Sequence, residues 1–128
     1  MYADELMIGD WAHDTRTPSN AKVVGLTNKG NIQFRTVDGK IVNVEPAYIE
    51  GVKITDKDLA TNFEETCCDN EYKIVGDFRL KYNGHVAAIG KLNYAYSEPA
   101  FEPICQLTYI HELQHVLRVL GVDSCLFI

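Results

Sequence analysis

Residues 31–44 read NIQFRTVDGKIVNV, and this stretch decides the fold of the N-terminal half. Ile32 and Phe34 alternate with polar residues, which is typical of a strand with one buried face. Asp38-Gly39 then predicts a two-residue turn of type I′, because both central positions of that turn need a positive φ. The second apolar run follows at once, so the sequence predicts a β-hairpin.

Short apolar runs also lie on both sides of this hairpin, and turn-forming residues separate them. The expected strands of the first half are residues 6–12, 22–26, 31–37, 40–44 and 48–54. Five short strands, with a break at Pro46, predict an SH3-like small β-barrel over residues 1–54, because closing the sheet removes most of its exposed edges.

The second half, residues 55–128, is expected to form an α+β lobe. Thr55 can cap a short helix, and Asp58 stands where a capping box needs an acidic residue. An antiparallel meander should follow, with expected strands at 72–75, 78–82 and 85–89 and a further strand through Leu92, Tyr94 and Tyr96. Pro99 and Pro103 are interpreted as the ends of a linker.

The last element is expected to be an amphipathic helix over residues 108–120, and Gly121 is placed to end it. Its apolar residues form one wide stripe, which should cover the meander. They are Tyr109, Ile110, Leu113, Val116, Leu117 and Leu120. The predicted fold class is therefore α+β, with a small barrel followed by an antiparallel sheet and two helices.

Composition narrows the range of functions. The 128 residues carry a formal net charge of −6, so we expect no nucleic-acid partner. The N-terminus lacks the basic region of a secretory signal, and no apolar segment is long enough to cross a membrane, which predicts a soluble cytoplasmic protein. The four cysteines include no C-x-x-C pair and are expected to be reduced thiols.

One motif in the chain is known from catalysis. His111, Glu112 and His115 form the H-E-x-x-H pattern, in which two histidines on one helical face bind Zn²⁺ while the glutamate activates water. A minimal zinc metallopeptidase, with Glu112 as the catalytic base and His111 and His115 as metal ligands, is therefore one hypothesis.

The surroundings of the motif favour a different interpretation. Arg118 and Gly121 stand where the longer metzincin pattern has glycine and histidine. Asp123, Cys125, His13 and His85 are the conceivable third ligands, and none has a recognisable spacing from the motif. The helical wheel places both histidines on the polar side with Thr108, Gln114 and Arg118, facing water. We therefore expect no catalytic residue, no cofactor and no bound metal, with the zinc enzyme as the alternative.

Three blocks of sequence carry a resemblance. They are residues 5–11 (ELMIGDW), 49–55 (IEGVKIT) and 109–115 (YIHELQH). Together they resemble a group of small uncharacterised proteins of gut anaerobes and their prophages, although Gly51 and Lys53 stand where that group tends to have proline. In the group, asparagine often takes the place of the second histidine of the motif. The resemblance implies no activity, no cofactor and no site residue.

These observations predict a non-catalytic accessory or interaction protein, which the resemblance would place on a mobile element. Its partner would be another protein or a second copy of the chain. The apolar C-terminal residues 125–128 (CLFI) are expected to pack into the sheet or into that second copy.

Overall fold

The predicted hairpin is present in the computed structural model, which describes residues 5–27, 29–36, 38–95 and 98–128. Strands β3 (Ile32–Arg35) and β4 (Ile41–Val44) pair antiparallel, with Phe34 opposite Val42. The predicted two-residue turn is wrong, although Gly39 has the positive φ, +84°, that the prediction required of it. The loop is longer than two residues, since the Thr36 N–H already donates to the Lys40 carbonyl oxygen at 2.8 Å.

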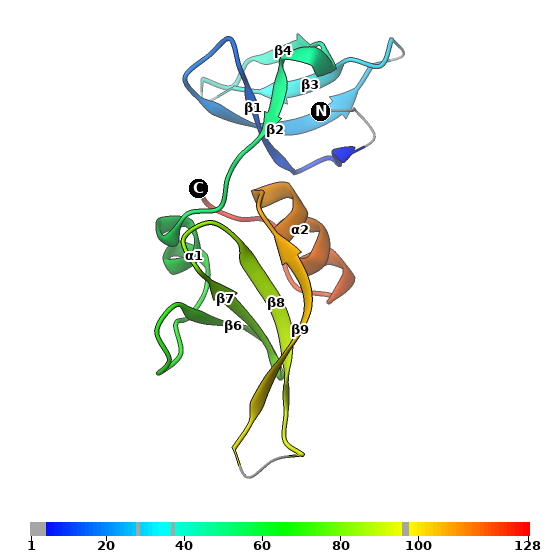
Figure 1. The fold of residues 1–128 in the computed structure, drawn as a ribbon. Coiled ribbons are helices and arrows are strands. Elements are labelled where there is room, and N and C mark those ends of the chain that lie inside the picture. The colour runs from blue at the N-terminus through cyan, green and yellow to red at the C-terminus, as the bar shows by residue number, and fades with distance from the viewer. Residues whose placement is uncertain (1–4, 28, 37, 96–97) are drawn as a thin grey trace. The chain divides into compact units, whose positions relative to one another are not determined.

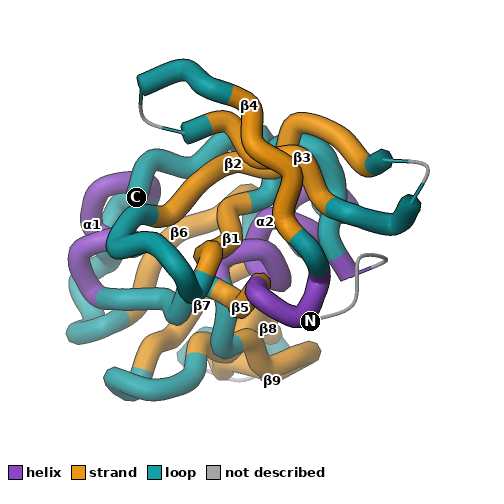
Figure 2. Tube along the Cα trace, turned by 90° about the horizontal axis from the view of Figure 1, so that it is seen from above, coloured by secondary structure: helices purple, strands orange, loops and turns teal. Residues whose placement is uncertain are grey.

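The chain divides into two units. The first runs to Lys53 and includes Tyr109–His111, and the second comprises Ile54–Thr108 and Glu112–Ile128. We call them the N-terminal and C-terminal units. Each contains one antiparallel sheet, and the described residues form two α-helices (Figures 1 and 2), which confirms the α+β class.

The sheet of the N-terminal unit has the strand order β4-β3-β2-β1-β5. The three further strands are β1 (Trp11–Asp14), β2 (Asn20–Leu26) and β5 (Ile49–Gly51), with the short 3-10 helix η2 (Pro46–Tyr48) before β5. The fifth strand returns to pair with the first, with Ala12 opposite Gly51. The sheet is not closed into a barrel, because β4 and β5 are its two edges.

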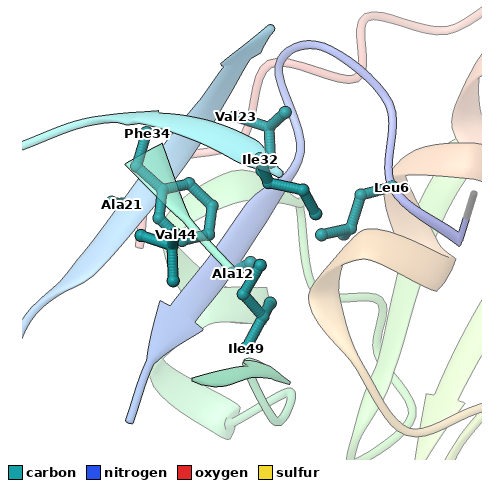
Figure 3. Close-up of a cluster of buried hydrophobic side chains, with 8 residues drawn as sticks. All are labelled: Leu6, Ala12, Ala21, Val23, Ile32, Phe34, Val44 and Ile49. Carbon is teal, nitrogen blue, oxygen red and sulfur yellow. The ribbon is translucent and has the colours of Figure 1, made fainter. Parts of the chain in front are cut away.

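The core of this unit follows from the alternation in the strands. Phe34 and Ile32 are almost completely buried, as are Val23 and Val44 from the neighbouring strands. Figure 3 shows these side chains together in one cluster that also contains Leu6, Ala12, Ala21 and Ile49. Residues of alternate positions thus supply one face of the sheet.

The expected strand over residues 6–12 starts later than predicted. Gly9 has φ +94°, and the Asp10 N–H donates to the Met7 carbonyl oxygen at 3.0 Å. The Asp10 carboxylate in turn accepts from the Met7 N–H at 2.8 Å. A closed turn therefore occupies Met7–Asp10, and the strand begins only at Trp11.

The C-terminal unit begins with the predicted capping box. Helix α1 (Asp56–Asn62) starts after Thr55, whose hydroxyl accepts from the Asp58 N–H, while the Asp58 carboxylate accepts from the Thr55 N–H. Two N–H groups at the helix start are thereby satisfied by side chains.

The second sheet has the order β6-β7-β8-β9 (Figure 1). Its strands are β6 (Glu71–Val75), β7 (Phe78–Tyr82), β8 (Ala87–Asn93) and β9 (Ala100–Leu107). The interpretation of Pro99–Pro103 as a linker is wrong, since Pro103 lies within β9. Proline is tolerated there because β9 is an edge strand and its register shifts opposite Ile89 and Gly90.

The prediction of a separate strand through Leu92, Tyr94 and Tyr96 is also wrong. Leu92 ends β8 together with Asn93, Tyr94 follows that strand, and Tyr96 lies outside the described residues. No helix of the described residues is long and apolar enough to span a bilayer.

Helix α2 (Ile110–Val119) is the predicted terminal helix. Gly121 has φ +74°, and the Val122 N–H donates to the Leu117 carbonyl oxygen at 2.9 Å. This is the pattern of a left-handed helix end, so the predicted C-terminal cap is confirmed.

Candidate functional site

The H-E-x-x-H residues lie on α2 as their spacing requires, with the two histidines one turn apart. The expectation that both imidazoles face water is wrong, because His111 is only 5% exposed. Its ring stacks on Tyr109 with 5.7 Å between the ring centroids and an interplanar angle of 15°. His115 is half-buried.

The buried face of α2 is wider than the predicted apolar stripe, whose residues Ile110, Leu113 and Leu117 are buried. Gln114, which the helical wheel places on the polar side, is also completely buried. The reason lies in the tail of the C-terminal unit, because the Gln114 side chain donates from Nε2 to the Ser124 carbonyl oxygen at 3.0 Å. The segment after Gly121 therefore contacts Gln114 on the polar side of the helix.

Glu112 has a defined structural partner. Its Oε1 accepts a hydrogen bond from the Thr108 N–H at 3.0 Å, just before the helix begins. A carboxylate in the first turn also interacts favourably with the positive end of the helix dipole. Burial raises the pKa of the nearby Cys105 thiol, and the Glu112 carboxylate raises it further. This geometry gives Glu112 the role of a helix cap.

The conceivable third zinc ligands lie in separate surroundings. His13, on β1, has its Nε2 3.8 Å from Glu50 Oε1. His85 is exposed, and the Asp123 carboxylate accepts from the Cys125 N–H at 2.9 Å. Over the described residues, no three His, Cys, Asp or Glu side chains are grouped so that they could hold a metal ion.

The C-terminal tail packs within its own unit. Leu126 is buried, and Asn62 at the end of α1 makes two hydrogen bonds with the backbone of Phe127. The Phe127 N–H donates to Asn62 Oδ1 at 2.8 Å, and Asn62 Nδ2 donates to the Phe127 carbonyl oxygen at 2.7 Å. The Phe127 side chain itself is 70% exposed.

A second candidate site lies at the end of the N-terminal sheet. A pocket of about 370 Å³ has an apolar floor formed by Ala21, Phe34 and Val42. Its rim is polar and contains Asp14, Thr17, Ser19, Asn20, Thr36 and Asp38. Such a mixture of apolar floor and polar rim is typical of sites that orient one apolar group.

The two rim carboxylates are ionised at neutral pH. Hydrogen bonds from the Arg16 side chain lower the pKa of Asp14, and one from the Thr36 hydroxyl lowers the pKa of Asp38. The rim thus carries negative charge, which Arg16 and Lys40 partly balance through ion pairs of 3.1 and 3.8 Å.

Strand β4 forms one side of this pocket and is an open edge. Its residues Ile41, Val42 and Asn43 are all exposed, with Ile41 at 57%. Paired positions in an antiparallel ladder alternate between hydrogen-bonded and non-hydrogen-bonded. Because Thr36 and Lys40 form a hydrogen-bonded pair, the backbone groups of Ile41 and Asn43 point away from β3.

The other sheet edges are protected. Strand β5 has three residues, and β9 contains Glu102 and Pro103. The edge of β6 is partly covered, since the Lys73 N–H donates to the Glu64 carbonyl oxygen at 2.9 Å. Only β4, among the edges that the structure describes, is both free of charged residues and apolar. The sequence analysis did not predict this site, although the uncharged run IVNV at residues 41–44 could have indicated an exposed sheet edge.

Comparison with known protein families, with curated proteins and with solved structures finds no match to this chain, so its resemblance to proteins of gut anaerobes stays a prediction.

Proposed function

We propose that the protein is a non-catalytic interaction module of the cytoplasm, which binds an extended segment of a partner protein along β4. The observation that carries this proposal is the uncharged apolar edge beside the pocket. An added strand would receive main-chain hydrogen bonds from Ile41 and Asn43, as in other cases of β-strand addition. One apolar side chain of the segment would enter the pocket and contact Phe34 and Val42.

Charge complementarity specifies the partner segment further. The chain carries a formal net charge of −6, and Asp14 and Asp38 lie on the pocket rim. A segment with a lysine or arginine near its apolar anchor would gain from this field, whereas a second copy of the chain would be repelled. We therefore propose a basic, extended peptide as the ligand.

We also propose that the N-terminal unit is an opened form of an SH3-like barrel. Support comes from the pairing of its last strand with its first, because closing a five-stranded barrel requires that return. The remaining opening would lie between β4 and β5, the two edges of the sheet. The exposed edge at β4 is then the feature of this fold that serves binding.

The test uses peptides selected from a random library displayed on phage, with the intact protein as bait. A selected synthetic peptide is titrated into the ¹⁵N-labelled protein. We expect the largest shifts at the amides of Ile41 and Asn43 and around Phe34. Val42→Lys should abolish binding, because it replaces part of the apolar floor with a long charged side chain.

Ile104→Lys is the matched control, since Ile104 is also an exposed apolar residue of an edge strand, with 62% exposure. It should leave peptide binding unchanged. Shifts confined to the second sheet would contradict the proposal. So would a dimer, detected by light scattering, that Val42→Lys dissociates, because the occupant of the edge would then be a second copy.

A further inference from the structure

The loop between β7 and β8 contains the one Asn-Gly pair of the sequence, Asn83-Gly84. Both residues are exposed, and Tyr82 pairs with Ala87 across the two strands, so the loop comprises residues 83–86. An asparagine followed by glycine readily loses its side-chain amide, because glycine has no side chain to keep its nitrogen away from the preceding carboxamide. In a folded protein the geometry of the loop decides how fast this happens.

The Asn83 side chain is held by two backbone donors. Its Oδ1 accepts hydrogen bonds from the N–H groups of His85 and Val86, at 2.8 Å each. These contacts turn the carboxamide forward along the chain, and they polarise its carbonyl group so that Cγ becomes more electrophilic. Two N–H groups on one carbonyl oxygen are also the arrangement of an oxyanion hole.

The backbone nitrogen of Gly84, which would be the nucleophile, is accessible. Among the residues that the structure describes, none accepts a hydrogen bond from the Gly84 N–H. Gly84 has φ +95°, and apart from its chain neighbours no heavy atom lies within 4 Å of the place that a Cβ atom would take. A side chain is disfavoured at that φ, so the turn itself favours the residue that leaves the nitrogen open.

We propose that Asn83-Gly84 is an autocatalytic modification site, at which Asn83 becomes a succinimide and then aspartate or isoaspartate. The Gly84 nitrogen attacks Asn83 Cγ, and the N–Cγ bond forms as negative charge develops on Oδ1. The Cγ–Nδ2 bond then breaks, and ammonia leaves with the proton that the Gly84 nitrogen loses. Water opens the cyclic imide at the side-chain carbonyl to give aspartate, or at the main-chain carbonyl to give isoaspartate.

The two donors stabilise the charged intermediate more than the starting amide. A hydrogen bond to an oxyanion is about twice as strong as one to a neutral carbonyl oxygen, so the N–H groups of His85 and Val86 lower the barrier to attack. An unfolded chain has to collect such donors during the reaction, whereas the folded loop holds them in place beforehand. The folded protein should therefore lose the amide faster than the same chain unfolded.

The two products act differently on the loop. Aspartate keeps an acceptor for both N–H groups. Isoaspartate leads the main chain through Cβ and Cγ, which adds one backbone atom between β7 and β8 and removes the side-chain acceptor. We therefore expect isoaspartate, and not aspartate, to destabilise this hairpin.

The experiment stores the full chain in mildly alkaline buffer, with and without guanidinium chloride, and follows the replacement of amide by carboxyl through the intact mass. Peptide mapping locates the change, which we expect at Asn83 and at a higher rate in the folded chain. Asn70 is the internal control, because it is also exposed but is followed by Glu71, whose N–H donates to the Cys68 carbonyl oxygen at 3.4 Å. Asn70 should keep its amide.

Two substitutions at one position separate the backbone donor from the side chain. His85→Pro removes one of the two N–H donors and should slow the reaction about tenfold, the rate equivalent of one hydrogen bond. His85→Ala is the matched control, since it keeps the N–H, and it should react at the wild-type rate. Circular dichroism checks that both variants fold.

The comparison with denaturant tests the same donors in the wild-type chain, so the test does not depend on the folding of His85→Pro. An Asn83 amide that stays intact, or one that is lost more slowly in the folded chain than in denaturant, would overturn the proposal. So would equal rates in folded His85→Pro and His85→Ala, because the backbone donor would then contribute nothing.

Discussion

The Gln114 side chain donates a hydrogen bond from Nε2 to the Ser124 carbonyl oxygen, 3.0 Å away, and Gln114 is completely buried. This contact ties the C-terminal tail to α2. It also explains why Gln114 is buried although it lies on the polar side of an amphipathic helix. The stability of the terminal segment should therefore depend on one glutamine.

Gln114→Ala should lower the free energy of unfolding by about 2 kcal/mol, because it removes a buried side chain and its hydrogen bond to the Ser124 carbonyl oxygen. Urea titration followed by circular dichroism measures the change. Gln106→Ala is the control, since Gln106 is exposed on β9, and it should change stability by less than about 0.5 kcal/mol. Equal effects of the two substitutions would refute this role of Gln114.

Gly51→Ala should also destabilise the protein, by about 1–3 kcal/mol, through overpacking. A Cβ atom at Gly51 would lie 2.5 Å from Tyr109 Cδ1, an atom of a rigid ring. Gly25→Ala is the matched glycine in the same sheet, where the added atom meets only the flexible end of Gln33 at 2.7 Å. In a double-mutant cycle, Tyr109→Ala should relieve most of the Gly51→Ala effect, and additive effects would contradict the clash.

Thr55→Ala should cost about 1 kcal/mol of stability, because the N–H of Asp58 loses its side-chain acceptor. Thr61→Ala removes an exposed hydroxyl later in the same helix and should have a smaller effect. Thermal unfolding compares the two variants. A larger loss for Thr61→Ala would show that the capping box contributes little.

Asp14 should make stability depend on pH in the acid range. Hydrogen bonds from Arg16 hold its pKa below the ordinary value of 3.8, so its contribution is present above that value and is lost as the pH falls through the lowered pKa. Asp14→Asn should lower the melting temperature at neutral pH, and the difference from wild type should shrink in acid. A constant difference down to the most acid conditions would contradict this linkage, and Asp69→Asn, at an exposed position, serves as the control.

Glu112 separates the two hypotheses for the H-E-x-x-H motif. As a helix cap, it should be replaceable by glutamine, which keeps an acceptor for the Thr108 N–H, while Glu112→Ala should cost about 1 kcal/mol. Elemental analysis of the purified protein measures the zinc content. Stoichiometric zinc that is lost in both His111→Ala and His115→Ala would favour the metallopeptidase instead.

Local patterns predicted much of the fold. Alternation around Phe34, the cap at Thr55 and the helix end at Gly121 all depend on residues a few positions apart, and the structure contains each of them. The turn at Gly39 was predicted in place but not in length, because the loop length depends on how the two strands pair. Features that depend on residues close together in the chain can therefore be predicted from the sequence alone.

The composition of β9 prevented its prediction as a strand. Two prolines suggested a linker, yet an edge strand needs hydrogen bonds on only one side, and the shift of register beside Pro103 accommodates the missing N–H. Whether a strand lies at an edge is a property of the whole sheet, which the residues of that strand do not specify.

The sequence by itself determined both helices and most of the strands, but not β9, because periodicity and capping act between near neighbours. Only the tertiary structure decided that His111 and Gln114 are buried and that the edge of β4 is open. Those outcomes depend on contacts between different segments of the chain, such as the hydrogen bond from Gln114 to the tail at Ser124. A helical wheel considers one helix alone and therefore cannot include such contacts.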